Sequence, residues 1–170
     1  MKKLILLVIL VLLPGFLFAE TVMLYTRMQP AETEKGKNID QFIAVEDGVE
    51  DQFYNSGHII FDAGVPRAED QSSVPINKSD SWAVQTAVSG GASYLLVVNL
   101  TFPSDTVAAV VPESISYRFA DLKTGETVAA GTLPVHLTQE QLKGKKPYDL
   151  CFSLGQEVAR SAMSKWQPAS

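Results

Sequence analysis

The residues best suited to chemistry are four acidic side chains in one short stretch of the chain, Glu46, Asp47, Glu50 and Asp51. Grouped carboxylates can bind a cation or act as an acid/base pair. Their i, i+4 spacing, however, places them along one face of a helix, and calcium sites generally need a loop that wraps oxygen ligands around the ion. The pattern therefore favours a solvated acidic helix face over a cation site or an acid/base site.

The two histidines are the other candidates for metal binding or proton transfer. His58 and His136 lie far apart in the sequence, and neither has a neighbouring Cys or His as zinc sites commonly do. Ser56, His58 and Asp62 have the residue types of a nucleophile, a base and an orienting acid. Four residues of strand would separate His58 from Asp62 by about 13 Å, which is too far for a hydrogen bond. We therefore predict no catalytic residue, no metal site and no cofactor.

The remaining reactive side chains also have a structural interpretation. Cys151 is the only cysteine and stands between two apolar residues, so it is predicted to be a buried thiol and no intramolecular disulfide can form. Lys143, Lys145 and Lys146 form a small basic patch that could dock a phosphate or an acidic partner. A solvated loop is the more common meaning of such a patch.

The elements that must position these side chains follow from hydrophobic periodicity, which predicts the order β-α-β-α-β-β-β-α. The fold class is α/β, with helices packed on a mixed sheet and an antiparallel hairpin towards the C-terminus. The predicted strands cover residues 21–28, 58–62, 94–102, 113–122 and 127–133, the predicted helices cover residues 38–55, 79–89 and 147–166, and exposed loops are predicted at 63–78 and 103–112.

Capping and turn residues set the predicted boundaries. Asn38 is expected to cap the first helix and Gly57 to end it. Gly90 stops the second helix, which is capped by Ser79 or Asp80. Gly125 belongs to a tight hairpin turn, and Pro147 opens the last helix. Gly48 lies inside the first helix, where it is expected to cost about 1 kcal/mol relative to Ala.

The first nineteen residues have the pattern of a secretory signal peptide. Two lysines precede an unbroken aliphatic run, Leu4–Leu13, and a small residue, Ala19, precedes the polar Glu20. A membrane-spanning helix needs about 20 apolar residues, and this run is shorter and is broken by a Pro-Gly pair. We predict cleavage between Ala19 and Glu20, one domain over residues 20–170, and export to the bacterial periplasm. Retention of the leader as an anchor is the alternative.

The charge of the chain excludes some partners. The net charge is −5, and it becomes more negative if Lys2 and Lys3 are removed with the leader. An acidic protein is poorly suited to non-specific binding of nucleic acid or anionic lipid. The better partner-contact candidates are Trp82 and an apolar stretch that contains Val107 and Val110, because aromatic and apolar side chains dominate interface energetics. Trp82 and Trp166 also fit the core faces of their helices, where burial is expected.

Three segments resemble motifs of one group of bacterial envelope domains. Residues 55–60 (NSGHII) resemble its helix–glycine–strand junction, residues 87–98 (AVSGGASYLLVV) its entry into a central strand, and residues 117–126 (YRFADLKTGE) its D-x-x-T-G-E hairpin. The group is the α/β domain shared by the CsgG-like curli-secretion lipoprotein, the penicillin-binding-protein activator LpoB and the N-terminal domain of TolB. The resemblance implies a non-catalytic envelope protein that binds or assembles with other envelope proteins.

The chain departs from this group in two ways. It lacks the lipid-bearing cysteine of the lipoprotein members, and its 63–78 loop could replace or add a contact surface. The leading hypothesis is therefore an exported, non-enzymatic periplasmic protein that binds other envelope proteins or further copies of itself. A small-molecule or glycan sensor is the alternative and would need a concave apolar pocket. An uncommon hydrolase is the second alternative and would need His58 and His136 to meet acidic residues in space.

Overall fold

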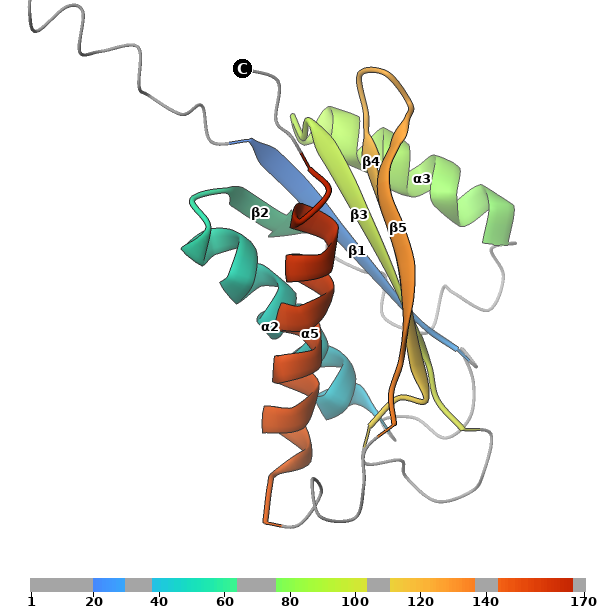
Figure 1. The fold of residues 1–170 in the computed structure, drawn as a ribbon. Coiled ribbons are helices and arrows are strands. Elements are labelled where there is room, and N and C mark those ends of the chain that lie inside the picture. Colours follow the sequence, from blue (N-terminus) through green and yellow to red (C-terminus); the bar gives the residue numbers. More distant parts are fainter. Residues whose placement is uncertain (1–19, 30–37, 64–75, 104–110, 137–143, 167–170) are drawn as a thin grey trace, which may run out of the picture.

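A computed structural model describes residues 20–29, 38–63, 76–103, 111–136 and 144–166 (Figure 1). The leader, the Val107 and Val110 positions, Lys143 and most of the 63–78 loop lie outside these residues, so the predictions made for them stay predictions. The elements are β1 (Thr21–Gln29), α2 (Ile39–Asn55), β2 (Ile59–Asp62), α3 (Ile76–Ser89), β3 (Tyr94–Thr101), β4 (Ser114–Asp121), β5 (Thr127–Pro134) and α5 (Pro147–Met163).

The five strands form one mixed sheet in the order β2-β1-β3-β4-β5. Strand β1 runs parallel to β2 and β3, β4 runs antiparallel to β3, and β5 runs antiparallel to β4. The continuous apolar run in β3 is buried on both faces, as expected for a central strand. The predicted element order and fold class are confirmed, and Gly125 takes a positive φ in the β4–β5 turn.

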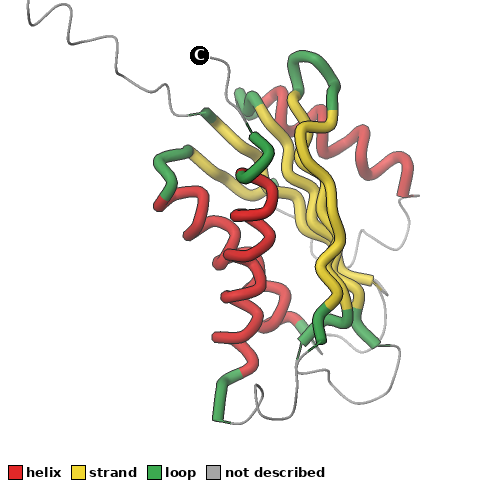
Figure 2. The backbone as a smooth tube through the Cα atoms, in the orientation of Figure 1, coloured by secondary structure: helices red, strands yellow, loops and turns green. Residues whose placement is uncertain are grey.

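Helices cover the two faces of the sheet unequally (Figure 2). Helices α2 and α5 lie side by side on one face, and α3 crosses the other. The larger core lies under α2 and α5, and the smaller one joins Ala83 and Ala87 of α3 to Met23, Tyr25, Leu95 and Val97 of the sheet. Within the described residues, no helix is long and apolar enough to cross a membrane.

Two glycines let α2 and α5 approach to backbone contact. A Cβ at Gly48 would fall on the carbonyl oxygen of Phe152, and a Cβ at Gly155 would fall on that of Val45. A helical glycine costs about 1 kcal/mol relative to alanine. Here that cost is offset by the close packing of two helices, which buries Val45, Phe53 and Cys151 completely.

An aromatic cluster closes one end of the larger core. Trp166 follows the end of α5 and is buried as predicted, with its ring centroid 4.9 Å from that of Tyr94 and 5.1 Å from that of Phe119. The Phe119 ring also meets Phe53 edge-on at 6.0 Å. These edge-to-face contacts join the end of α2, the two central strands and the C-terminal segment.

Two local predictions were wrong. Helix α3 begins at Ile76 rather than at Ser79 or Asp80, because residues 76–78 contain no helix breaker. Trp82 is 36% exposed, because Ala83 and Ala87 occupy the sheet-facing positions of α3. Asn38 occupies the N-cap position of α2 as predicted, although its side chain makes no capping hydrogen bond.

We predict that Gly48→Ala lowers the free energy of unfolding by about 3 kcal/mol, because the new methyl group forces α2 and α5 apart. Urea denaturation measures this loss. Gly57→Ala is the matched control. Gly57 has a φ of 84° and nothing within contact distance of an added Cβ, so only backbone strain of about 1 kcal/mol is expected. Equal losses in the two variants would contradict the steric explanation.

Candidate functional site

The acidic face of α2 points partly into the protein. Glu46 is half-buried between α2 and the sheet, near the hydroxyl of the fully buried Thr26 on β1 and the carboxylate of Asp62 on β2. Neither Glu46 Oε1 nor Thr26 Oγ1 has a hydrogen-bond partner of full geometry among the described residues. The solvated face expected from the sequence is therefore wrong for Glu46.

Burial favours the protonated form of this carboxyl. It raises the pKa of Glu46 to about 7, against an opposing influence of the Thr26 hydroxyl and with smaller contributions from nearby carboxylates such as Asp62 and Glu50. Burial, followed by Asp62 and Asp47, also raises the pKa of Glu50. The described residues contain no group of three or more His, Cys, Asp or Glu side chains that could hold a metal ion. What this cluster can do chemically is take up and release a proton.

The other two acids of the stretch bind the neighbouring helix. The Tyr148 hydroxyl donates a hydrogen bond to Asp47 Oδ2, and Gln156 Nε2 donates to Asp51 Oδ2 at 2.9 Å. Both donors belong to α5. These carboxylates therefore align α2 with α5, a role that depends on a long-range contact and has no signal in the local sequence.

The histidines do not meet. His58 precedes β2 at one edge of the sheet, where its ring lies 4.4 Å from that of Trp166, and burial lowers its pKa. His136 is exposed just beyond β5, at the opposite edge. Asp62 faces the α2 carboxylates, whereas His58 packs against the aromatic cluster. A hydrolase would need His58 and His136 to meet acidic residues at one site, and the described residues contain no such site.

Cys151 is the buried core thiol that the sequence predicted. It is fully buried beneath α5, and desolvation raises its pKa to about 12. A thiol with so high a pKa is almost entirely protonated at neutral pH and is a poor nucleophile.

Helix α3 carries three exposed apolar side chains, Trp82, Val84 and Val88, which we call the α3 surface. Val84 and Val88 lie one turn apart on one side of the helix, and Trp82 lies on the other side of the row formed by Ala83 and Ala87. The side chains of Trp82, Val84 and Val88 are 36%, 39% and 58% exposed. The Trp82 ring lies 5.7 Å from Tyr25, and the Arg27 guanidinium lies 5.4 Å from the same Tyr25 ring. The α3 surface therefore begins next to a cation and an aromatic ring on the sheet, a combination typical of interface anchors.

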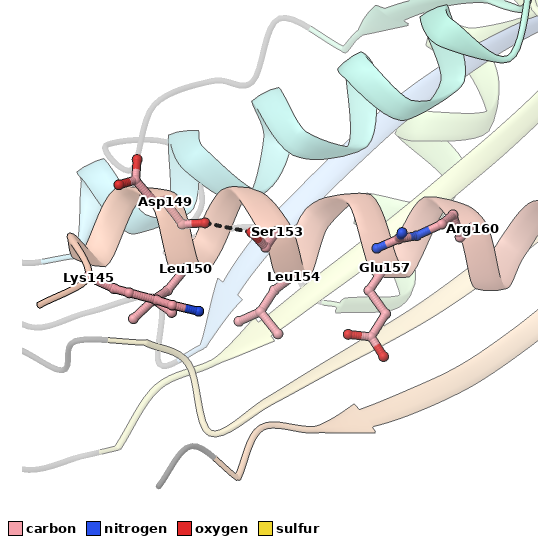
Figure 3. Close-up of a pocket in the computed structure, with 7 residues that line it drawn as sticks. All are labelled: Lys145, Asp149, Leu150, Ser153, Leu154, Glu157 and Arg160. Atoms are coloured by element: carbon pink, nitrogen blue, oxygen red, sulfur yellow. Dashed lines mark hydrogen bonds between the residues drawn. The ribbon is translucent and has the colours of Figure 1, made fainter. Parts of the chain in front are cut away.

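A groove runs along the side of α5 (Figure 3). Its volume is about 460 Å³, and it is lined by Lys145, Asp149, Leu150, Ser153, Leu154, Glu157 and Arg160. Leucine side chains form its apolar part, and charged side chains surround them. This lining is more polar than the apolar pocket expected of a small-molecule sensor. The sequence does not predict this groove, whose lining residues all come from α5 and from Lys145 just before it.

Among the comparisons with known proteins, only the one with solved structures gives matches. No family model matches the chain, and no curated protein matches it in sequence. Similar structures include the PelC dodecamer from Paraburkholderia phytofirmans, with a TM-score of 0.49 and 16% identity over 87% of this chain and 89% of that chain. The LpoB C-terminal domain from Salmonella enterica has a TM-score of 0.41 and 14% identity over 76% of this chain and 92% of that chain.

TolB from Acinetobacter baumannii is also similar, with a TM-score of 0.45 and 10% identity over 86% of this chain. The match covers 28% of the TolB chain, so this chain spans under a third of that protein's length. Two of the three proteins named by the sequence resemblance, LpoB and TolB, thus recur among the structural matches. For the curli-secretion lipoprotein the resemblance stays a prediction.

We predict that Glu46 makes stability fall as the pH rises. Its unfolded-state pKa is 4.5 and its folded-state pKa is about 7. The folded state therefore binds the proton more tightly, and the stabilisation is complete below pH 4.5 and lost as the pH rises through 7. Relative to Glu46→Gln, which stays neutral, the wild type should lose about 3 kcal/mol between pH 4.5 and pH 8.

Urea denaturation at several pH values measures this difference. Glu157→Gln is the control, because it changes an exposed carboxyl of α5 and should leave the pH dependence of the wild type intact. Parallel stability curves for Glu46→Gln and the wild type would show that Glu46 titrates alike in the folded and unfolded states.

Proposed function

We propose that this chain is an exported, non-enzymatic domain of the bacterial envelope that binds another envelope protein through the α3 surface. The observation that carries the proposal is the exposure of Trp82, Val84 and Val88 on a helix whose sheet-facing positions are already filled. Val84 and Val88 lie one turn apart on one side of α3, and adjoining exposed apolar side chains favour an interaction site.

The α3 surface suits a partner for a physical reason. Among the described side chains of α3, Ala83 and Ala87 are the ones buried against the sheet, so the larger apolar side chains do not contribute fully to the core. Covering a valine or tryptophan side chain removes it from water and contributes about 1.5–3 kcal/mol per side chain. Trp82, predicted as a partner contact, would supply the aromatic anchor that interface hot spots favour.

Independent features of the sequence support the same function. The leader pattern predicts export, the negative charge disfavours nucleic acid, and the motif resemblance implies envelope proteins that bind others. The titratable groups of the described residues also serve structural roles: Cys151 lies in the core, His58 packs on Trp166, and Asp47 and Asp51 bind α5.

A photo-cross-linking residue at Val88 tests the proposal in living cells. We expect the full-length chain to form a covalent adduct with one exported protein, identified by mass spectrometry. A cross-linker at Lys123, which is exposed in the β4–β5 turn, should give no such adduct. Adducts at both positions, or at neither, would contradict binding through α3.

A second variant separates binding from folding. Val88→Glu places a charge on the α3 surface and should reduce the adduct formed by a cross-linker at Val84 at least tenfold. Because Val88 is 58% exposed, the free energy of unfolding should change by no more than about 0.5 kcal/mol. An unchanged adduct yield would show that α3 does not carry the contact.

A further inference from the structure

The outer edge of β5 presents unpaired backbone groups. Strand β5 is the last strand of the sheet, and in an antiparallel pair alternate residues bond to the neighbour. Val135 N–H donates to Glu113 C=O at 2.9 Å, so the odd-numbered residues of β5 face β4. The N–H and C=O groups of Ala130 and Thr132 therefore point outward, and no other described residue pairs with them.

Within the part of the chain that the structure describes, features that discourage strand pairing occur only at the ends of this edge. A register irregularity opposite Phe119 and Ala120 interrupts pairing near the hairpin, and Pro134, which has no N–H, ends the strand. The regular window from Ala129 to Leu133 contains no charged residue. Soluble proteins commonly blunt exposed edges with Lys, Pro or bulges, so an unblunted window is a template for another strand.

The α5 groove lies beside this window. Gly155 faces α2, and a helix turns 100° per residue, so Leu150 and Glu157 lie on the opposite side of α5 and Leu154 lies beside them, turned away from α2. Helix α5 also contacts β5, which forms the edge of the sheet. Figure 3 shows the side chains of all three pointing from α5 towards the strands. A strand added to β5 would thus run under the groove.

We propose that the β5 edge and the α5 groove together bind an extended peptide segment of a partner protein by strand addition. The backbone groups of Ala130 and Thr132 supply the hydrogen bonds, and the groove receives alternate side chains. This proposal concerns a different surface from α3 and goes beyond the proposed function, so either one can fail without the other.

The groove and the sheet define the chemistry of the segment. Its groove-facing side chains, at every second position, would be apolar because they meet Leu150 and Leu154. The intervening side chains would lie on the other face of the sheet, next to the exposed side chains of Ala130 and Thr132, where polar residues remain in contact with water.

A phage-displayed library of random heptapeptides, selected on the purified full-length chain, tests the proposal. We expect enriched peptides to alternate apolar with polar residues. Thr132→Pro removes one outward N–H without disturbing the bonds to β4, because proline is tolerated where the N–H faces outward at an edge. It should weaken binding of the enriched peptides about tenfold. Thr132→Val keeps the N–H and is the matched control.

Two further measurements test the geometry. Leu154→Glu should weaken peptide binding about tenfold or more, whereas Val88→Glu on the α3 surface should leave it unchanged. In hydrogen exchange, the amides of Ala130 and Thr132 should gain protection when the peptide binds. The amide of Gly131, already paired with β4, should not change. This exchange pattern reports the binding mode even if Leu154→Glu proves unstable.

Several outcomes would overturn the proposal. No enrichment, or enriched peptides that bind Thr132→Pro as tightly as the wild type, would show that the edge does not recruit a strand. Peptides without alternation that lose binding only to Leu154→Glu would show a groove that works without β5. A chain that is dimeric by light scattering, but monomeric as Thr132→Pro, would assign the edge to a second copy instead.

Discussion

The packing of α2 against α5 is the contact on which the rest of the structure depends. It requires the absence of a side chain at Gly48 and Gly155, where the backbone of one helix meets the other. Because the helices lie this close, both fit on one face of the sheet and bury a continuous core. The same contact brings Asp47 and Asp51 within reach of α5 donors and directs the opposite side of α5 towards β5.

The two faces of the sheet consequently have different characters. The face under α2 and α5 is apolar and holds the partly buried carboxyl of Glu46 at its margin. The other face has a small core under α3 and then becomes polar, where Arg27 Nε donates to Asn99 Oδ1 at 2.8 Å.

The element order could be predicted from the sequence because it depends on local periodicity. The alternation of Ile115, Tyr117 and Phe119 predicted which face of β4 is buried, and Pro147 predicted the start of α5. The predictions failed where a contact with a segment distant in the sequence decides the outcome. The sequence predicts only a cost for Gly48, because the residue that it contacts, Phe152, lies about a hundred residues further along the chain.

The two tryptophans of this chain occupy opposite environments. Trp166 is enclosed by aromatic rings at one end of the main core, whereas Trp82 lies partly in solvent on α3, across the sheet. Their fluorescence therefore separates into a short-wavelength emission shielded from dissolved quenchers and a long-wavelength emission accessible to them. The molecule carries two intrinsic optical reporters, one for the integrity of its interior and one for events at its surface, without any added label.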